Sequence, residues 1–112
     1  MARPFESTRD IIIRTPDWDN AVEFYRSVLG FPVAHEDKAL VGFETGAFKL
    51  YVERGARHSP VFELLVRDVE DTRDRLLAAG CTLQEEDVAV PRCYLRDPYG
   101  LVFNIRQRSA SP

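Results

Sequence analysis

The chain has 112 residues, of which 45% are hydrophobic and 29% are charged, and its formal net charge is −3 at pH 7. This length suits a single domain, residues 1–112, with one sizeable core. The small and dispersed charge argues against nucleic acid as a partner, because such proteins normally carry a clustered basic face. No apolar run approaches the roughly 18–20 residues that cross a bilayer, so we also expect no membrane partner.

The cysteine content and the N-terminal segment indicate in which cellular compartment the protein resides. The two cysteines, Cys81 and Cys93, are too few for a disulfide framework, and their spacing matches no metal motif. The first ten residues lack the apolar stretch of a secretory signal. We therefore interpret the cysteines as reduced thiols and expect a cytoplasmic protein.

The first half of the chain predicts a strand, a helix and three further strands. A β-branched run over 10–14 predicts the first strand, which Pro16 ends because proline lacks a ladder donor. Asp17 is a good N-cap, with its carboxylate accepting from the free amides of the first turn, and Gly30 is a good helix end. The three following strands are expected at 31–35, 40–44 and 48–53.

The second half predicts the same series. A strand is expected over 61–66, and a helix begins after Asp68 and ends at Gly80. Further strands are expected from Cys81, over 93–96 and over 101–106, the last two joined by the turn residues Asp97-Pro98-Tyr99-Gly100.

Corresponding residues of the two halves lie at similar offsets. Asp17 and Asp68 are about 51 residues apart, and Gly46 and Gly100 are about 54 apart. We therefore predict two modules within the single domain, the first at about 8–54 and the second at about 60–107.

Two segments carry a family resemblance. These are NAVEFYRSVLGFP at 20–32 and YLRDPYGLVFNIR at 94–106. In this order, and inside the doubled pattern, they resemble the vicinal oxygen chelate superfamily, the group of glyoxalase I, bleomycin resistance proteins and extradiol dioxygenases. The resemblance covers about residues 8–107. It implies an α+β fold of two βαβββ modules, whose curled mixed sheets surround a cleft, and a homodimer.

The resemblance also implies where a metal would bind. Metal-dependent members of the superfamily take one ligand from the first and one from the last strand of each module. Those positions fall here on Asp10, Leu50, Val61 and Asn104. The equal spacing from Gly46 to Leu50 and from Gly100 to Asn104 supports this alignment.

The residues at these positions are poor metal ligands. Asp10 is the one strong ligand type, whereas Leu50 and Val61 cannot ligate and Asn104 offers a weak neutral oxygen. Because a catalytic divalent ion needs about three protein ligands, we expect no metal and no cofactor.

Glu63 leaves an alternative open. It lies two residues from Val61, hence on the same face of its strand, and it is expected to pair with an arginine or to face solvent. The alternative is a shifted carboxylate pair with Asp10, which His58 would complete as a metal site. His35 and His58, the two histidines of the chain, are otherwise expected at the surface or in packing.

Strand alternation predicts the lining of the cleft. In the last strand it places Phe103 and Ile105 toward the second helix. Toward the cleft it places Val102, Asn104 and Arg106. The fourth strand is the awkward case, because the same assignment turns Lys49 toward the first helix. The predicted ligand-binding residues are Asp10, Ile12, Phe48, Leu50, Val61, Glu63, Tyr94, Asn104 and Arg106.

These features favour a binding protein. An apolar pocket with a few polar groups suits a small organic molecule, and the carboxylates of Asp10 and Glu63 would suit a cationic one. The first hypothesis is therefore a metal-free protein that sequesters its ligand, as in the bleomycin-resistance branch. The alternatives are a glyoxalase- or dioxygenase-type enzyme with a shifted metal site, and a dimerising module without a small ligand. No catalytic residue is assigned.

Overall fold

The computed structural model describes residues 4–89 and 92–108, which form two compact units. The first unit is Arg9–Pro60. The second unit runs from Val61 onward and includes the start of the chain up to Thr8. Each unit has the strand-helix-three-strand series that the sequence predicts, so the expected α+β class with two βαβββ modules is confirmed. Within the described residues, no helix is long and apolar enough to cross a membrane.

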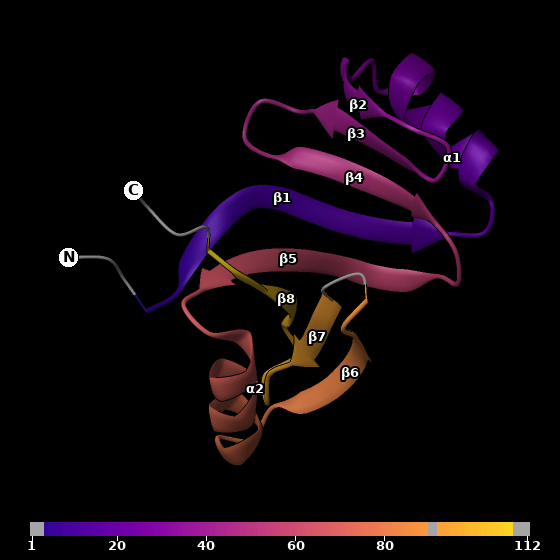
Figure 1. The fold of residues 1–112 in the computed structure, drawn as a ribbon. Coiled ribbons are helices and arrows are strands. Elements are labelled where there is room, and N and C mark those ends of the chain that lie inside the picture. The colour runs from indigo at the N-terminus through magenta and orange to yellow at the C-terminus, as the bar shows by residue number, and fades with distance from the viewer. Residues whose placement is uncertain (1–3, 90–91, 109–112) are drawn as a thin grey trace. The chain divides into compact units, whose positions relative to one another are not determined.

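The first unit is a mixed sheet covered on one face by a helix (Figure 1). The strands run in the order β2-β3-β4-β1, with β1 parallel to β4 and the other neighbours antiparallel. The elements are β1 (Glu6–Thr15), α1 (Trp18–Glu23), its π-helical continuation η1 (Phe24–Val28), β2 (Val33–Glu36), β3 (Leu40–Glu44) and β4 (Lys49–Arg54).

The core of the first unit lies between α1 and the sheet. The Trp18 ring is buried, and its Nε1 donates a hydrogen bond to the carbonyl oxygen of Val52 at 2.9 Å. The apolar side chains of this helical segment are buried only in part, because Phe24, Val28 and Leu29 remain exposed. The chain widens there into a π turn, which rotates later side chains away from an α-helical stripe. The buried core residues are Trp18, Val22, Val41, Phe43, Leu50 and Val52.

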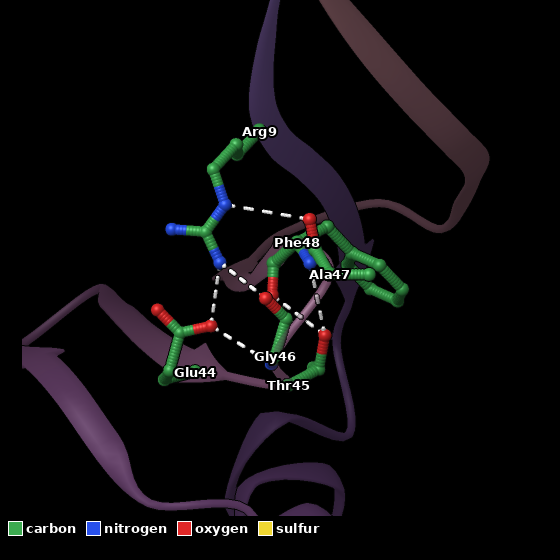
Figure 2. A network of polar contacts seen from close by, with 6 residues as sticks. All are labelled: Arg9, Glu44, Thr45, Gly46, Ala47 and Phe48. Atoms are coloured by element: carbon green, nitrogen blue, oxygen red, sulfur yellow. Dashed lines mark hydrogen bonds and ion pairs between the residues drawn. The ribbon is translucent and has the colours of Figure 1, made fainter.

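Arg9 fixes the turn between β3 and β4 (Figure 2). Its Nη2 donates to the Glu44 carboxylate at 2.7 Å and to the Gly46 carbonyl at 2.9 Å, and its Nε donates to the Ala47 carbonyl at 3.3 Å. The same Glu44 oxygen accepts from the Gly46 amide at 2.8 Å. The hydrogen bonds from Arg9 and from the Gly46 amide, and after them the charge of Arg9, lower the pKa of Glu44. This turn therefore has a defined length, which sets the register of β4.

The second unit has the same design (Figure 1). Its strands run in the order β5-β8-β7-β6, with β5 parallel to β8. Its buried core of Val66, Cys93, Leu95, Phe103 and Ile105 packs with Val69 and Leu76 of α2. The elements are β5 (His58–Val66), α2 (Val69–Ala78), β6 (Thr82–Asp87), β7 (Arg92–Arg96) and β8 (Val102–Gln107).

All four helix ends lie where the sequence predicts them, but one of the two predicted capping hydrogen bonds is absent. Gly30 and Gly80 have φ of 70° and 107°, a left-handed conformation that glycine adopts without strain. The Asp68 carboxylate accepts from the Asp71 amide at 3.0 Å, as an N-cap should. The first helix also begins after Asp17, as predicted, but the expected hydrogen bond to a first-turn amide is absent, because Asp17 Oδ1 accepts instead from the side-chain amide of Asn20, at 2.9 Å.

Candidate functional site

The second unit carries a polar cluster on the face of its sheet opposite α2. Glu63 of β5 and Asn104 of β8 are ladder partners. Phe103 and Ile105, on either side of Asn104, lie in the core with α2, so Asn104 points the other way. The facing predicted for β8 is therefore confirmed.

Hydrogen bonds join Glu63, Asn104 and Arg106. Arg106 binds the Glu63 carboxylate with two donors, Nε to Oε2 at 3.2 Å and Nη2 to Oε1 at 3.1 Å. The Asn104 amide donates to Glu63 Oε2 at 3.3 Å, while Asn104 Oδ1 accepts from the Cys93 backbone amide at 2.9 Å. Each polar atom of the Asn104 side chain is thus engaged within the sheet.

The burial of the Glu63 carboxylate explains why these hydrogen bonds are needed. The Glu63 side chain is 9% exposed, whereas that of Arg106 is 50% exposed. A buried carboxylate is destabilising unless a cation and hydrogen-bond donors compensate for it, and the two-donor guanidinium contact provides both. Of the alternatives for Glu63, pairing with an arginine is confirmed. A further pairing with Asp10 stays a prediction.

Tyr94 extends the cluster along β7. It is 5% exposed and is the ladder partner of Asn104, so its ring lies on the same face. The Arg92 guanidinium lies 5.6 Å from the ring centre and also binds Glu85 of β6, with Nη1 to Oε2 at 2.8 Å. An aromatic ring beside an arginine can stack with a planar group or accept a cation–π contact.

The first unit turns a different set of residues to its corresponding face. The ladder pairs Asp10 with Lys49 and Ile11 with Leu50. Leu50 is buried in the core beside α1, and Phe48 also packs against that core. The predicted orientation of Phe48 and Leu50, on the same face as Asp10, is therefore wrong.

The error comes from the lengths of two turns. Residues 45–48 connect the closing pair Glu44 and Lys49, whereas residues 97–101 connect Arg96 and Val102. Measured from the turn glycine, β4 starts one residue later than β8. Because strand side chains alternate, a shift of one residue reverses the face. Ligand binding by Asp10, Ile12, Phe48, Leu50, Val61, Glu63, Tyr94, Asn104 and Arg106 stays a prediction.

The residues at the superfamily's ligand positions do not fit a divalent metal. Leu50 and Val61 have no donor atom, and the Asn104 oxygen already accepts a hydrogen bond from Cys93. Across residues 4–89 and 92–108, no three His, Cys, Asp or Glu side chains come together as a metal site. Burial raises the pKa of the free thiols of Cys81 and Cys93, so neither is activated as a nucleophile.

The first unit contains a cavity that the sequence did not predict. Its volume is about 370 Å³. Of its lining residues, the sequence singled out Asp17 as a helix cap and His58 as a candidate for a functional role, but not Arg57. Arg57 belongs to no motif that could have indicated this cavity from the sequence. The lining residues are Ile13, Arg14, Thr15, Asp17, Asn20, Ala21, Tyr25, Arg57 and His58.

Residues 10–106 match the family described as "Glyoxalase-like domain". No curated protein matches the sequence. Several solved structures share the fold. A glyoxalase/bleomycin resistance protein/dioxygenase superfamily member from Vibrio splendidus is 18% identical with a TM-score of 0.59, over 93% of this chain and 99% of that one.

Two further structures are similar at low identity. A hypothetical protein from Bacillus halodurans has a TM-score of 0.66 at 10% identity, over 98% of this chain and 99% of that one. The Mn(II)-bound glyoxalase from Novosphingobium aromaticivorans has a TM-score of 0.55 at 20% identity, over 94% of this chain but 42% of that one. At these identities the similarity shows the fold alone, so any statement about function has to rest on the residues of the site.

Proposed function

We propose that this chain, which belongs to the glyoxalase-like domain family of the vicinal oxygen chelate superfamily, binds a small organic molecule and holds it without chemical change. The contact between Glu63 and Arg106 carries this proposal. It places a guanidinium on the carboxylate nearest to the superfamily's ligand positions in the second unit. The Arg106 guanidinium therefore compensates the negative charge of Glu63, which would otherwise be available to a metal ion.

The polar cluster of the second unit supports a binding role through its remaining donors. Nε and Nη2 of Arg106 bind Glu63, and Nη1 makes no hydrogen bond with the described part of the chain. That nitrogen is available to a carbonyl or anionic oxygen of a ligand, and the Tyr94 ring, on the same face of the sheet as Asn104, can stack with a planar group. A cationic ligand was expected partly because of the Glu63 carboxylate. Since Arg106 already compensates that carboxylate, Glu63 no longer favours a cationic ligand.

Metal content and thermal melting together test the proposal. The protein is purified without a metal-affinity tag, analysed for metals, and melted with Mn²⁺, Ni²⁺, Zn²⁺ or Fe²⁺ and with a panel of neutral, cationic and anionic aromatic compounds that includes bleomycin. We expect no stoichiometric metal, no stabilisation by the ions, and stabilisation by at least one compound. At about 100-fold over the dissociation constant, a ligand stabilises by roughly 2.7 kcal/mol, which is several degrees for a domain of this size.

Two variants show whether the compound uses the cluster. Arg106→Gln is expected to abolish its stabilising effect. Arg96→Gln, an equal charge change at an exposed end of β7, is expected to keep it. Stoichiometric metal, or melting shifts with metal ions, would instead favour the enzyme with a shifted metal site. A protein that responds to no compound would favour the dimerising module.

A homodimer and a cytoplasmic location belong to the same proposal. The exposed apolar side chains of Phe24, Val28 and Leu29 favour self-association, because monomers seldom leave such groups together in water. Sedimentation equilibrium is expected to give twice the chain mass of 12.8 kDa. The free thiols of Cys81 and Cys93 are compatible with a reducing compartment.

A further inference from the structure

The cavity of the first unit has the size of a small-molecule site. Its volume of about 370 Å³ lies within the roughly 300–1,000 Å³ typical of ligand pockets. It is lined by the C-terminal end of β1, by α1 and η1, by Arg57, and by His58, the first residue of β5. All of these residues belong to the first unit, whereas Glu63, Tyr94 and Arg106 belong to the second. The two sites can therefore be tested separately.

Part of the cavity wall is apolar and held in place. Ile13 and Ala21 pack against the core of the first unit. The Tyr25 ring is fixed by two aromatic contacts, to Phe24 at 5.4 Å and to Phe43 at 5.9 Å between ring centres. These three side chains offer a preformed surface to a flat or aliphatic group.

Most polar groups of the wall are satisfied by their neighbours. Arg14 Nε donates to the Glu53 carboxylate at 2.8 Å, so this ion pair compensates its own charge. The Asp17 carboxylate accepts from the Asn20 amide at 2.9 Å, but it keeps its negative charge. The Thr15 hydroxyl accepts from the Asp17 backbone amide at 3.1 Å.

Arg57 is the exception. Its side chain is exposed and forms no ion pair or hydrogen bond with the described residues, although it lines the cavity. The neighbouring His58 ring is held by a 2.8 Å contact between Nδ1 and the Ser59 carbonyl oxygen, which requires Nδ1 to be the donor. The guanidinium of Arg57 is thus the positive charge in this wall that no carboxylate of the described residues pairs with.

We propose that this cavity binds a small organic monoanion, with its carboxylate on Arg57 and its apolar or aromatic body against Ile13, Ala21 and Tyr25. A guanidinium binds a carboxylate through two parallel hydrogen bonds. The Asp17 carboxylate in the same wall disfavours a second negative charge, so a monoanion is preferred over a dianion. This site goes beyond the proposed function and does not depend on the polar cluster of the second unit.

An NMR titration with three matched probes tests the sign of the ligand charge. Benzoate, benzamide and benzylamine share the ring and differ in charge, and each is added to the full chain labelled with ¹⁵N. Benzoate is expected to shift the backbone amides of Ala21, Tyr25, Arg57 and His58 in a saturable way. Benzamide is expected to bind more weakly, and benzylamine is expected to cause no saturable shift at these amides. Phthalate, a dianion with the same ring, is expected to bind more weakly than benzoate.

A pair of variants tests the assigned residue. Arg57→Gln is expected to raise the benzoate dissociation constant by about tenfold, as the loss of one charge-assisted contact implies. Arg67→Gln removes the same charge from an exposed position of the second unit and is expected to leave the constant unchanged. Since the Arg57 side chain is exposed and forms no ion pair or hydrogen bond with the described residues, its replacement should keep the fold, which the unperturbed amide spectrum would verify.

Three outcomes would overturn the proposal. They are benzylamine binding as tightly as benzoate, an Arg57→Gln variant with unchanged affinity, and the absence of saturable shifts in the first unit. Shifts confined to amides near Tyr94 and Asn104 would count against this cavity, yet they would support the proposed function of the second unit. The two proposals therefore fail on different observations.

Discussion

In the first unit Arg14 of β1 pairs with Glu53 of β4, whereas in the second unit Glu63 of β5 pairs with Arg106 of β8. Each ion pair joins the first and the last strand of its unit, which pair in parallel. In the first unit the cation is on the first strand, and in the second unit it is on the last strand. The better-buried partner is also exchanged. Arg14 is 11% exposed beside a Glu53 that is 24% exposed, and Glu63 is 9% exposed beside a half-exposed Arg106. The same arrangement of strands thus buries a cation in the first unit and an anion in the second.

The aromatic side chains differ in the same way. In the first unit Tyr51 of β4 lies over Gly42 of β3, close enough that a Cβ on Gly42 would be 2.7 Å from the ring. In the second unit the aromatic residue is Tyr94 of β7, and its ladder partner on β8 is Asn104. The last strand of the first unit therefore carries a ring at this point, whereas the last strand of the second unit carries Asn104 and its hydrogen bonds.

The largest expected effect comes from removing the cation of the second unit. Arg106→Met leaves the buried Glu63 carboxylate without its guanidinium, and we expect a loss of about 3 kcal/mol in the free energy of unfolding. Arg14→Met should lose only about 1 kcal/mol, because Glu53 is more exposed and is solvated by water. Urea denaturation measures both. An equal or larger effect of Arg14→Met would contradict the comparison.

The next effect concerns a second negative charge. Asn104→Asp places two carboxylates side by side, so the pKa of the new carboxyl should rise in the folded state. The loss of stability, about 2 kcal/mol at pH 7, should appear as the pH rises above the ordinary carboxyl range and vanish below it. Asn20→Asp makes the same change beside Asp17 at an exposed site and should have little effect. Matching pH profiles for the two variants would show that burial is irrelevant.

A smaller effect tests the ring over the glycine. Gly42→Ala places a methyl group 2.7 Å from the Tyr51 ring, which must move, and we expect a loss of about 1 kcal/mol. In a Tyr51→Leu background the same substitution should be nearly neutral, because the ring is gone. Thermal unfolding of the four proteins gives the coupling energy. Additive effects of the two substitutions would mean that the ring does not limit the space at Gly42.

The smallest effect is a pH dependence in the turn between β3 and β4. Because Arg9 lowers the pKa of Glu44, the folded state binds fewer protons than the unfolded state in the acid range. The contribution is complete above the ordinary pKa of 4.5 and is lost as the pH falls through the lower folded value. Glu44→Gln should flatten this part of the melting-temperature profile slightly. An unchanged profile would show that the pair in Figure 2 contributes nothing to stability.

Local chemistry explains what the sequence predicted correctly. The ends of the helices depend on single residues, such as Gly30 and Gly80 at positive φ and Asp68 as a cap, so they can be recognised without the fold. The facing of β8 follows from strand alternation, which is also local. The two segments at 20–32 and 94–106 identified the superfamily for the same reason, since their pattern reflects these local elements.

The candidate site required the tertiary structure. Whether Leu50 faces the helix depends on the length of the turn before β4, and a difference of one residue reverses the answer. Glu63 and Arg106 are 43 residues apart in sequence, so their contact exists only when β5 and β8 pair. Arg57 carries no motif and becomes a candidate only because it lines a cavity. The sequence determined the elements and the superfamily because these depend on neighbouring residues, whereas the fold decided which charges meet because that depends on distant ones.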